Sequence, residues 1–250
     1  MIAFTGDIHG GVDIEKLSNR SLKKRGISLT ENDFLMIAGD FGLPFLDEDI
    51  EAYENGESNE YTYWINWLSE KPYTVLWVDG NHENHAWWDK QPVTERFGGR
   101  VQVHPHAGNV IRLMRGEIYE INGKRIFTFG GAVSTDREYR TEGCSWWPRE
   151  QAGDDEIAHA EEKLDSAGRE VDYIVTHTMP MSRIIGEYYR PVPDRGAEYF
   201  DKVMNTVKYK VWVCGHFHVD RLLDNNICIL YNEIVSGESL ESIIERRSGR

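Results

Sequence analysis

The chain has 250 residues, of which 40% are hydrophobic and 28% charged, and its formal net charge is −14. This length and composition are typical of a soluble globular protein and exclude a disordered chain. The negative charge argues against nucleic acid and against an anionic membrane surface as partners, because both call for a basic face. No linker, repeat or low-complexity block is visible, so we expect a single domain over residues 1–250.

Cysteine is scarce, and Cys144, Cys214 and Cys228 form no Cys-x-x-Cys pair. This usage favours a reducing compartment and argues against a disulfide framework or a structural zinc site. The N-terminus has no signal-peptide pattern, and no apolar stretch reaches the roughly 18–20 residues that cross a bilayer. We therefore expect a cytoplasmic protein without a membrane segment.

The first third of the chain alternates apolar runs with amphipathic segments. Short apolar runs at 2–5, 34–38 and 75–78 predict strands that are buried on both faces. Apolar residues at helical spacing predict helices over 13–24 and 61–70. The acidic segment between the second run and the second helix, 43–60, is expected to be a solvated loop or short helix.

The middle of the chain changes character. Three short β-like runs at 110–114, 117–121 and 125–129 are separated by turn residues, including Asn122-Gly123, a strong hairpin signal. This meander predicts a second sheet packed on the first. An irregular segment rich in Arg, Trp and Ser then occupies 132–150.

The last third returns to alternation. We expect helices at 154–167 and 197–207, each followed by a buried strand, at 173–176 and 211–214. A loop with three prolines, 179–196, lies between them. A hairpin is predicted over residues 220–231, and the charged tail from residue 238 is expected to fray.

Potential metal ligands stand directly after five of these predicted strands. They are Asp7 with His9, Asp40, Asn81 with His82, His177, and His216 with His218. Taken singly, each is more often a structural histidine or a turn residue. Five in one chain are hard to assign to chance, because ligands of open α/β sheets bind outside the carboxyl ends of the strands. The spacing of two between Asp7 and His9 lets both side chains point to one side of an extended chain.

The donor types predict the metal. Imidazole and carboxylate suit Mn, Fe, Zn or Ni, and among these we favour Mn. The groups are too many for one tetrahedral ion and suit two ions that share a bridging carboxylate. Two ions roughly 3.5–4 Å apart bind phosphate and provide hydroxide at neutral pH. Such a pair would let an acidic protein accept an anionic substrate.

With these motifs the sequence resembles the calcineurin-like metallophosphoesterase superfamily. The match runs in the family's order over nearly the whole chain, through Gly-Asp7-Ile-His9, Gly-Asp40, Gly-Asn81-His82-Glu83, His177 and Gly-His216-Phe-His218. The resemblance implies an α/β fold, a four-layer α/β/β/α sandwich of two mixed sheets flanked by helices.

The resemblance also implies roles for single residues. One metal ion would be held by Asp7, His9, Asp40 and His218. The other would be held by Asp40, Asn81, His177 and His216, with Asp40 bridging the two ions. His82 corresponds to the family's histidine that contacts the phosphoryl group and protonates or stabilises the leaving oxygen, a task that suits an imidazole near neutral pH. Glu83 would orient His82.

One motif departs from the family pattern. Many members, notably the protein phosphatases, continue the second motif as Gly-Asp-x-x-Asp-Arg, and its Arg contacts phosphate. Here the motif reads Gly39-Asp40-Phe41-Gly42-Leu43-Pro44, which argues against a close kinship with phosphoprotein phosphatases. Arg137 or Arg140 could replace the missing Arg; the alternative is that both are ordinary surface residues.

Three segments could form the rim that selects the substrate. They are 43–60, 132–150 and 179–196, the last carrying Arg183, Tyr188, Tyr189 and Arg190. The expected function is a dinuclear metal-dependent phosphoesterase that hydrolyses phosphate mono- or diesters by attack of a metal-bridging hydroxide. A small phosphoester or nucleotide is the favoured substrate. A phosphoprotein phosphatase, or a non-catalytic scaffold that acts through protein contacts, stays open as an alternative.

Overall fold

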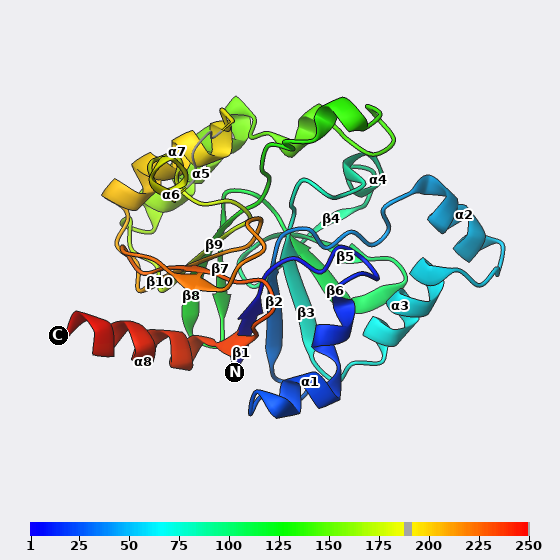
Figure 1. The fold of residues 1–250 in the computed structure, drawn as a ribbon, viewed down its shortest axis with the longest axis horizontal. Coiled ribbons are helices and arrows are strands. Elements are labelled where there is room, and N and C mark those ends of the chain that lie inside the picture. Colours follow the sequence, from blue (N-terminus) through cyan, green and yellow to red (C-terminus); the bar gives the residue numbers. More distant parts are fainter. Residues whose placement is uncertain (188–191, 250) are drawn as a thin grey trace.

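The structure is a computed structural model that describes residues 1–187 and 192–249. Within these residues, a seven-stranded and a six-stranded sheet pack face to face and helices cover their outer faces (Figure 1). Both sheets mix parallel and antiparallel neighbours. The four-layer α/β/β/α sandwich that the resemblance implied is therefore confirmed.

The first sheet has the order β13–β1–β2–β3–β6–β5–β4. Its strands are β1 (Ile2–Thr5), β2 (Phe34–Ala38), β3 (Thr74–Val78), β4 (Val93–Arg96), β5 (Gly99–His104), β6 (Ala107–Leu113) and β13 (Val235–Ser236). The four central strands β1, β2, β3 and β6 run parallel, so their carboxyl ends lie at one edge of the sheet.

The second sheet has the order β11–β12–β10–β9–β8–β7. Its strands are β7 (Glu117–Ile121), β8 (Lys124–Phe129), β9 (Tyr173–Thr176), β10 (Val211–Cys214), β11 (Arg221–Leu222) and β12 (Ile227–Ile229). Strands β8, β9, β10 and β12 are parallel, and the outer strands β7 and β11 pair antiparallel.

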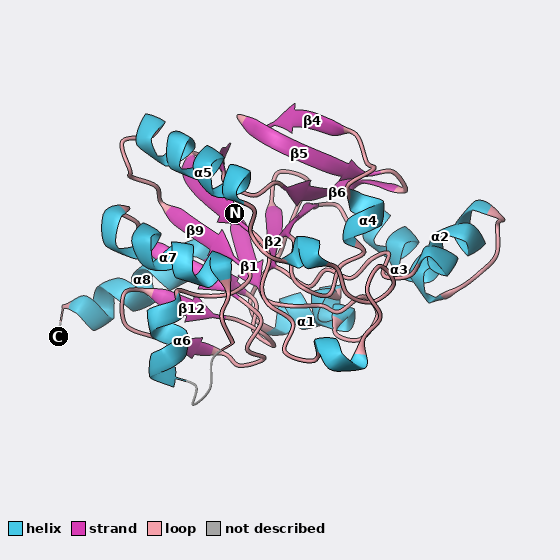
Figure 2. Cartoon of the chain, turned by 90° about the horizontal axis from the view of Figure 1, so that it is seen from above, coloured by secondary structure: helices cyan, strands magenta, loops and turns pink. Residues whose placement is uncertain are grey.

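Helices lie on both sides of the two sheets. They are α1 (Asn19–Lys24), α2 (Asp47–Glu54), α3 (Glu60–Ser69), α4 (His85–Trp88), α5 (Asp154–Ser166), α6 (Met181–Glu187), α7 (Arg195–Thr206) and α8 (Gly237–Ser248), with 3-10 turns at Ile14–Leu17, Arg137–Tyr139 and Pro148–Glu150. In Figure 2, α5, α6 and α7 lie on the left and α3 and α4 on the right, with β1 and β2 between them.

The alternation of side chains along β2 explains the layers. Met36 and Ala38 face the apolar layer between the sheets, whereas Leu35 and Ile37 face the helices of the first outer layer. All four are buried, because a strand in a sheet covered on both sides buries both of its faces.

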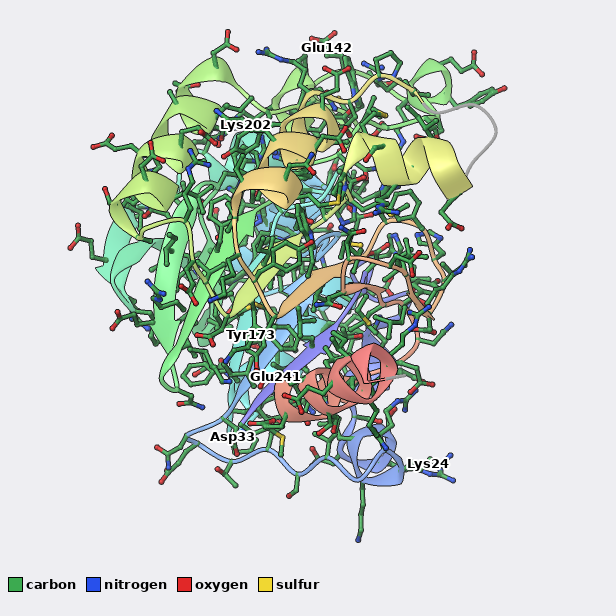
Figure 3. All side chains as sticks on the ribbon, turned by 90° about the vertical axis from the view of Figure 1, so that its left-hand side faces the viewer. Lys24, Asp33, Glu142, Tyr173, Lys202 and Glu241 are labelled. Carbon is green, nitrogen blue, oxygen red and sulfur yellow. The ribbon has the colours of Figure 1, made fainter. Side chains whose placement is uncertain are left out.

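The charged tail does not fray, which corrects the sequence expectation. It forms α8, whose Leu240 and Ile244 are buried with the residues between the sheets. The phenol of Tyr173 in β9 donates a 2.6 Å hydrogen bond to the carboxylate of Glu241, and the two side chains meet in Figure 3. Helix α8 thus closes the interior along one side.

Other expectations were wrong in detail. The predicted helix over 13–24 is broken at Ser18, which is extended and caps α1 with its hydroxyl. Strand β6 joins the first sheet, so only β7 and β8 of the expected meander belong to the second. The proline-containing loop 179–196 includes helix α6, and β4 and β5 were not expected. None of the helices among the described residues is long and apolar enough to span a membrane.

Candidate metal centre

The predicted ligands follow strands of both sheets. Asp7, His9, Asp40 and Asn81 come after β1, β2 and β3, and His177, His216 and His218 come after β9 and β10. Because the two sheets are packed face to face with these strand ends adjacent, the loops bring the seven residues into one cluster. Two groups form within it, and they meet at Asp40.

The first group, which we call the His177 half, contains Asp40, Asn81 and His177. His177 Nε2 lies 3.3 Å from Asp40 Oδ1 and 3.0 Å from Asn81 Oδ1. The other ring nitrogen, Nδ1, is 2.9 Å from the carbonyl oxygen of Ala38. Since a carbonyl only accepts, Nδ1 carries the hydrogen, and Nε2 of a neutral ring presents a lone pair to two further acceptors.

The His216 side chain lies next to this half but makes no hydrogen bond with Asp40, Asn81 or His177. Its ring stands edge-on to that of His177 with the centroids 4.9 Å apart, and it lines the same cavity as Asp40 and Asn81. The backbone amide of His216 donates to Asp7, at 2.9 Å to Oδ1. Burial, together with the neighbouring His177, lowers the pKa of His216 to about 4.

The second group, the His9 half, contains Asp7, His9, His218 and the other oxygen of Asp40. His9 Nε2 is 3.3 Å from Asp40 Oδ2, and His218 Nε2 is 3.2 Å from Asp7 Oδ2. One ligand atom from each of Asp7, His9 and His218 lies within 4.8 Å of the others. As in the first half, imidazole nitrogens converge on carboxylate oxygens.

The carboxylates in this cluster favour positive charge on the groups between them. Burial would lower the pKa of His177, but Asp40 and Asp7 outweigh it and raise that pKa to about 10. The pKa of His9 is raised to about 9, because Asp40 and Asp13 outweigh the opposite effect of burial. Either protons on the rings or a cation between the donors can supply the charge, and imidazole with carboxylate and amide oxygen suits a divalent transition metal. The residues present therefore fit such an ion.

The backbone at the cluster is unusual. His9, Asp40, His216 and His218 have φ values of 44°, 47°, 68° and 51°. Left-handed backbone costs a residue with a side chain about 1–3 kcal/mol and is concentrated at functional sites. The alternation of an extended strand, which we invoked for Asp7 and His9, is therefore not the cause of their convergence, since the turns after the strands aim these side chains.

Glycines before the ligands are needed for space. A Cβ on Gly80 would stand 2.0 Å from Asp40 Oδ1, and a Cβ on Gly215 would stand 2.1 Å from Asp7 Oδ1. Neither glycine has a positive φ. Gly80 and Gly215 thus let a carboxylate from a neighbouring strand end approach the backbone, and Gly39 leaves room for the His177 ring.

His82 lies beside both halves, in contact with Arg140. Arg140 Nη2 is 3.1 Å from His82 Nδ1 and 2.8 Å from Nε2, and it also pairs with Asp136 Oδ2 at 2.8 Å. Burial lowers the pKa of His82, and Arg140 adds to this against the opposing effect of Asp40. Arg137 has other partners: its Nε donates to the Ser134 carbonyl, and its guanidinium lies 5.4 Å from the Trp146 ring centroid.

Glu83 does not contact the His82 side chain, contrary to the expected orienting role. Its carboxylate is fully buried and accepts three backbone hydrogen bonds, from Phe41 at 2.7 Å, Gly42 at 2.9 Å and Gly80 at 3.2 Å. Burial and Asp40 raise the pKa of Glu83 to about 8. Glu83 therefore joins the loop after β2 to the loop after β3, which carry Asp40 and Asn81.

Several supporting residues were not found from the sequence. Asp13 Oδ2 accepts from His9 Nδ1 at 2.9 Å and from the Tyr231 hydroxyl at 3.2 Å. The ring of Tyr231 stacks on His218 at 4.6 Å between centroids. The position of Asp13 four residues after His9 was a usable signal, whereas Tyr231 is remote in sequence and gave none.

A second chain of hydrogen bonds fixes Asn81. Its Nδ2 donates to Ser134 Oγ at 3.2 Å, and that hydroxyl donates to Glu150 Oε2 at 2.6 Å. The amide oxygen of Asn81 is thereby directed at His177. The segment 132–150 thus supports the cluster through Ser134 and Glu150, in addition to Arg140.

A cavity of about 180 Å³ opens at the cluster and reaches the segment 132–150, which contributes Thr135 and Asp136 to its wall. In the segment 179–196, Arg183 donates to Asn225 and is not part of this wall. The predicted rim residues Tyr188, Tyr189 and Arg190 lie outside the described residues.

The fold and the donor set together define an α/β sandwich protein with a candidate divalent-metal centre. A family model described as calcineurin-like phosphoesterase matches residues 1–220, and the chain belongs to this family. The resemblance drawn from the motifs is confirmed.

A similar solved structure adds evidence for the fold alone. One crystal structure aligns with a TM-score of 0.50 at 12% identity, covering 92% of this chain and 88% of the other. A structure of a candidate 5′-nucleotidase from Staphylococcus aureus in complex with alpha-ketoglutarate aligns with a TM-score of 0.45 at 11% identity, covering 92% of this chain and 48% of the other. No curated protein sequence matches the chain.

Proposed function

We propose that the protein is a dinuclear metal-dependent phosphoesterase that acts on small phosphate esters. The observation that carries this proposal is the position of Asp40, whose Oδ1 faces His177 and whose Oδ2 faces His9, each at 3.3 Å. A carboxylate placed between two sets of donors is what a bridging ligand requires. Membership of the phosphoesterase family supplies the reaction class.

The seven donors divide between two ions. One ion would be held by Asp7, His9, Asp40 and His218, and the other by Asp40, Asn81, His177 and His216. We propose manganese, since imidazole, carboxylate and amide oxygens suit it and no cysteine is among the donors. When bound, two such ions polarise a phosphoryl oxygen and lower the pKa of water to about 7.

The chain's own residues would complete the reaction. His82 lies beside Asp40 and lines the 180 Å³ cavity, where a phosphoryl group would contact the donors. We assign it the transfer of a proton to the leaving oxygen, a step that contributes about 10²–10⁴-fold. Arg140 would pair with the phosphoryl oxygens in place of the Arg that the second motif lacks. Glu83 would hold in place the loops that carry Asp40 and Asn81, and would not orient His82.

We also treat residues 1–250 as one domain whose inserted segments form the rim of the site. Thr135 and Asp136 from 132–150, and Leu43 and Asp49 from 43–60, line cavities next to the cluster and support this for two of the three segments.

The test begins with removal of metal by a chelator, followed by addition of Mn, Ni, Zn or Mg. We expect Mn to restore hydrolysis of aryl phosphate mono- or diesters and calorimetry to count two ions per chain. H82A should lower kcat about 10²–10⁴-fold with both ions still bound. The matched control is H159A, which removes a partly exposed histidine that pairs with Glu117.

Hydrolysis that is unaffected by the chelator, or binding of a single ion, would rule out the dinuclear mechanism. Tight binding of two ions without hydrolysis of any phosphoester would instead favour a non-catalytic scaffold.

A further inference from the structure

A second and larger cavity, of about 370 Å³, opens beside the candidate metal centre. We call it the side cavity. His9 and His82 line it, and His82 also lines the smaller cavity at the metal donors. The His82 ring therefore stands where the two cavities adjoin. A substrate whose phosphoryl group lies at the donors would have its ester oxygen near His82 and the rest of its alcohol in the side cavity.

The walls of the side cavity are mostly apolar. Leu43, Phe45 and Tyr61 line it together with the backbone of three glycines, and Val12 and Leu46 stand at its mouth with exposed fractions of 78% and 42%. A volume of this size and a largely apolar lining are typical of small-molecule sites. Exposed apolar side chains at the mouth of such a site favour an apolar ligand.

The carboxylates that line the side cavity are not offset by a Lys or Arg in the described part of its wall. Apart from the two imidazoles, the charged lining residues are Asp49 and Glu60, and neither Lys nor Arg is among the described residues of the wall. Asp49 accepts a hydrogen bond from the Leu46 amide at 3.1 Å, and Glu60 stands against Gly11. Neither carboxylate has a salt-bridge partner among the described residues, so the side cavity repels anions and attracts cations.

We propose that the side cavity binds the alcohol part of the substrate, and that this alcohol has an apolar body and a positively charged end. This inference rests on the proposed phosphoesterase function and narrows its substrate class. Hydrolysis would break the bond between phosphorus and the ester oxygen and form a bond from phosphorus to water oxygen. The ester oxygen would leave as an alcohol with a proton from His82, and the proton that the water loses would pass to solvent, which reprotonates His82. Nucleoside polyphosphates are disfavoured because their further phosphates would face Asp49 and Glu60.

The test uses phenyl phosphates that differ only in the para substituent: aminomethyl, hydroxymethyl and carboxylate. We expect kcat/KM to fall in that order, with the change residing mainly in KM. E60Q and D49N should each reduce the ratio between the aminomethyl and carboxylate substrates about fivefold. D49N retains an oxygen for the Leu46 amide, and E57Q, which removes an exposed carboxylate outside the side cavity, is the matched control.

The apolar wall is tested separately. L46A should raise KM for phenyl phosphate more than for methyl phosphate, whereas V93A, which shortens an exposed side chain on β4, should leave both unchanged. Because each readout is a ratio between substrates, a variant that folds less well lowers both values and leaves the ratio in place.

A binding measurement separates this inference from the proposed function. Titration of 4-(aminomethyl)phenol should give binding to the native protein that is about fivefold weaker in E60Q and unchanged in E57Q. Such binding would support the proposed role of the side cavity even if no ester were hydrolysed. The lack of hydrolysis would then overturn only the phosphoesterase proposal. Equal ratios in all variants, a preference for the carboxylate substrate, or binding unaffected by E60Q would overturn the inference.

Discussion

On the His177 side of Asp40 the donors are held by buried groups, whereas on the His9 side they are held by groups that water can reach. His177 is fully buried and its Nδ1 contacts a backbone carbonyl. His9 relies on the carboxylate of Asp13, and the His218 side chain, 51% exposed, stacks on Tyr231. A backbone carbonyl can neither titrate nor rotate away, so the two halves should differ in how firmly they retain an ion.

The largest expected effect is the loss of Asp40, because both halves share it. D40N keeps the size of the side chain but removes the charge that faces His177 and His9. We expect hydrolysis to fall to background and the metal stoichiometry to drop below two. Activity assays and calorimetry on the same preparation check this, with D155N, an exposed aspartate, as control. Two ions bound to D40N with native affinity would contradict the bridging role.

The comparison between the halves is sharpened by single histidine variants. H177A should weaken metal binding more than H218A, because it removes a buried donor with a fixed tautomer. Each substitution should weaken the affinity for metal at least about 10-fold, which is the smallest loss typical of removing a residue that only supports a ligand. Excess Mn should restore hydrolysis in H218A at a lower concentration than in H177A. The reverse order would show that burial does not determine how the halves retain an ion.

The next prediction concerns pH and metal removal. The pKa values of His177 and His9 are raised to about 10 and 9 in the folded chain, above the ordinary value of 6.5. Their contribution to the stability of the metal-free protein is therefore fully present below about pH 6.5 and is lost as pH rises through 9 to 10. We expect the Tm of the metal-free protein to fall over this window.

Because protons and metal compete for the same ring nitrogens, added Mn should raise Tm more at pH 9 than at pH 6. H177A should show a smaller decline with pH than the native chain. A Tm of the metal-free native protein that rises through the same window would contradict the assignment of these two histidines.

The smallest expected effect is a difference in kcat/KM between substitutions of Arg140 and Arg137, which the sequence could not distinguish. R140A removes a cation that contacts His82, and we expect kcat/KM to fall about 10- to 100-fold, as for the loss of a charged hydrogen bond. R137A removes a cation beside Trp146, and the change should stay within about threefold. Equal effects of the two substitutions would exclude the special role of Arg140.

Local patterns in the sequence predicted two sheets and the place of the ligands, whereas the four layers were implied by the family resemblance. Unbroken apolar runs at β1, β2 and β3 indicated covered strands, and polar residues after Gly indicated their carboxyl ends. Four of the predicted ligands lie in left-handed turns after the strands, so strand alternation does not aim their side chains. Local spacing therefore predicted where the ligands would be but not how each is aimed.

Contacts that join distant segments could not be predicted in the same way. Glu83 looked like a partner of His82 because it is adjacent in sequence, yet its carboxylate lies on the amides of Phe41 and Gly42. The segment that forms α8 looked like a solvated tail because most of its residues are polar or charged. The helical spacing of four between Leu240 and Ile244 was overlooked. The burial of these residues depends on a gap between two sheets that no local pattern specifies.

The last thirty residues have a consequence for protein engineering. The family match ends at residue 220, yet β13 pairs with β1 and the ring of Tyr231 lies on His218. Lys16 also binds the carbonyl oxygens of Asp7 and Tyr231, each at 2.5 Å. A graft of this domain onto another protein that stopped at the family boundary would leave β1 as an open edge and the His9 half without its lining. A transplantable unit must carry the segment through α8.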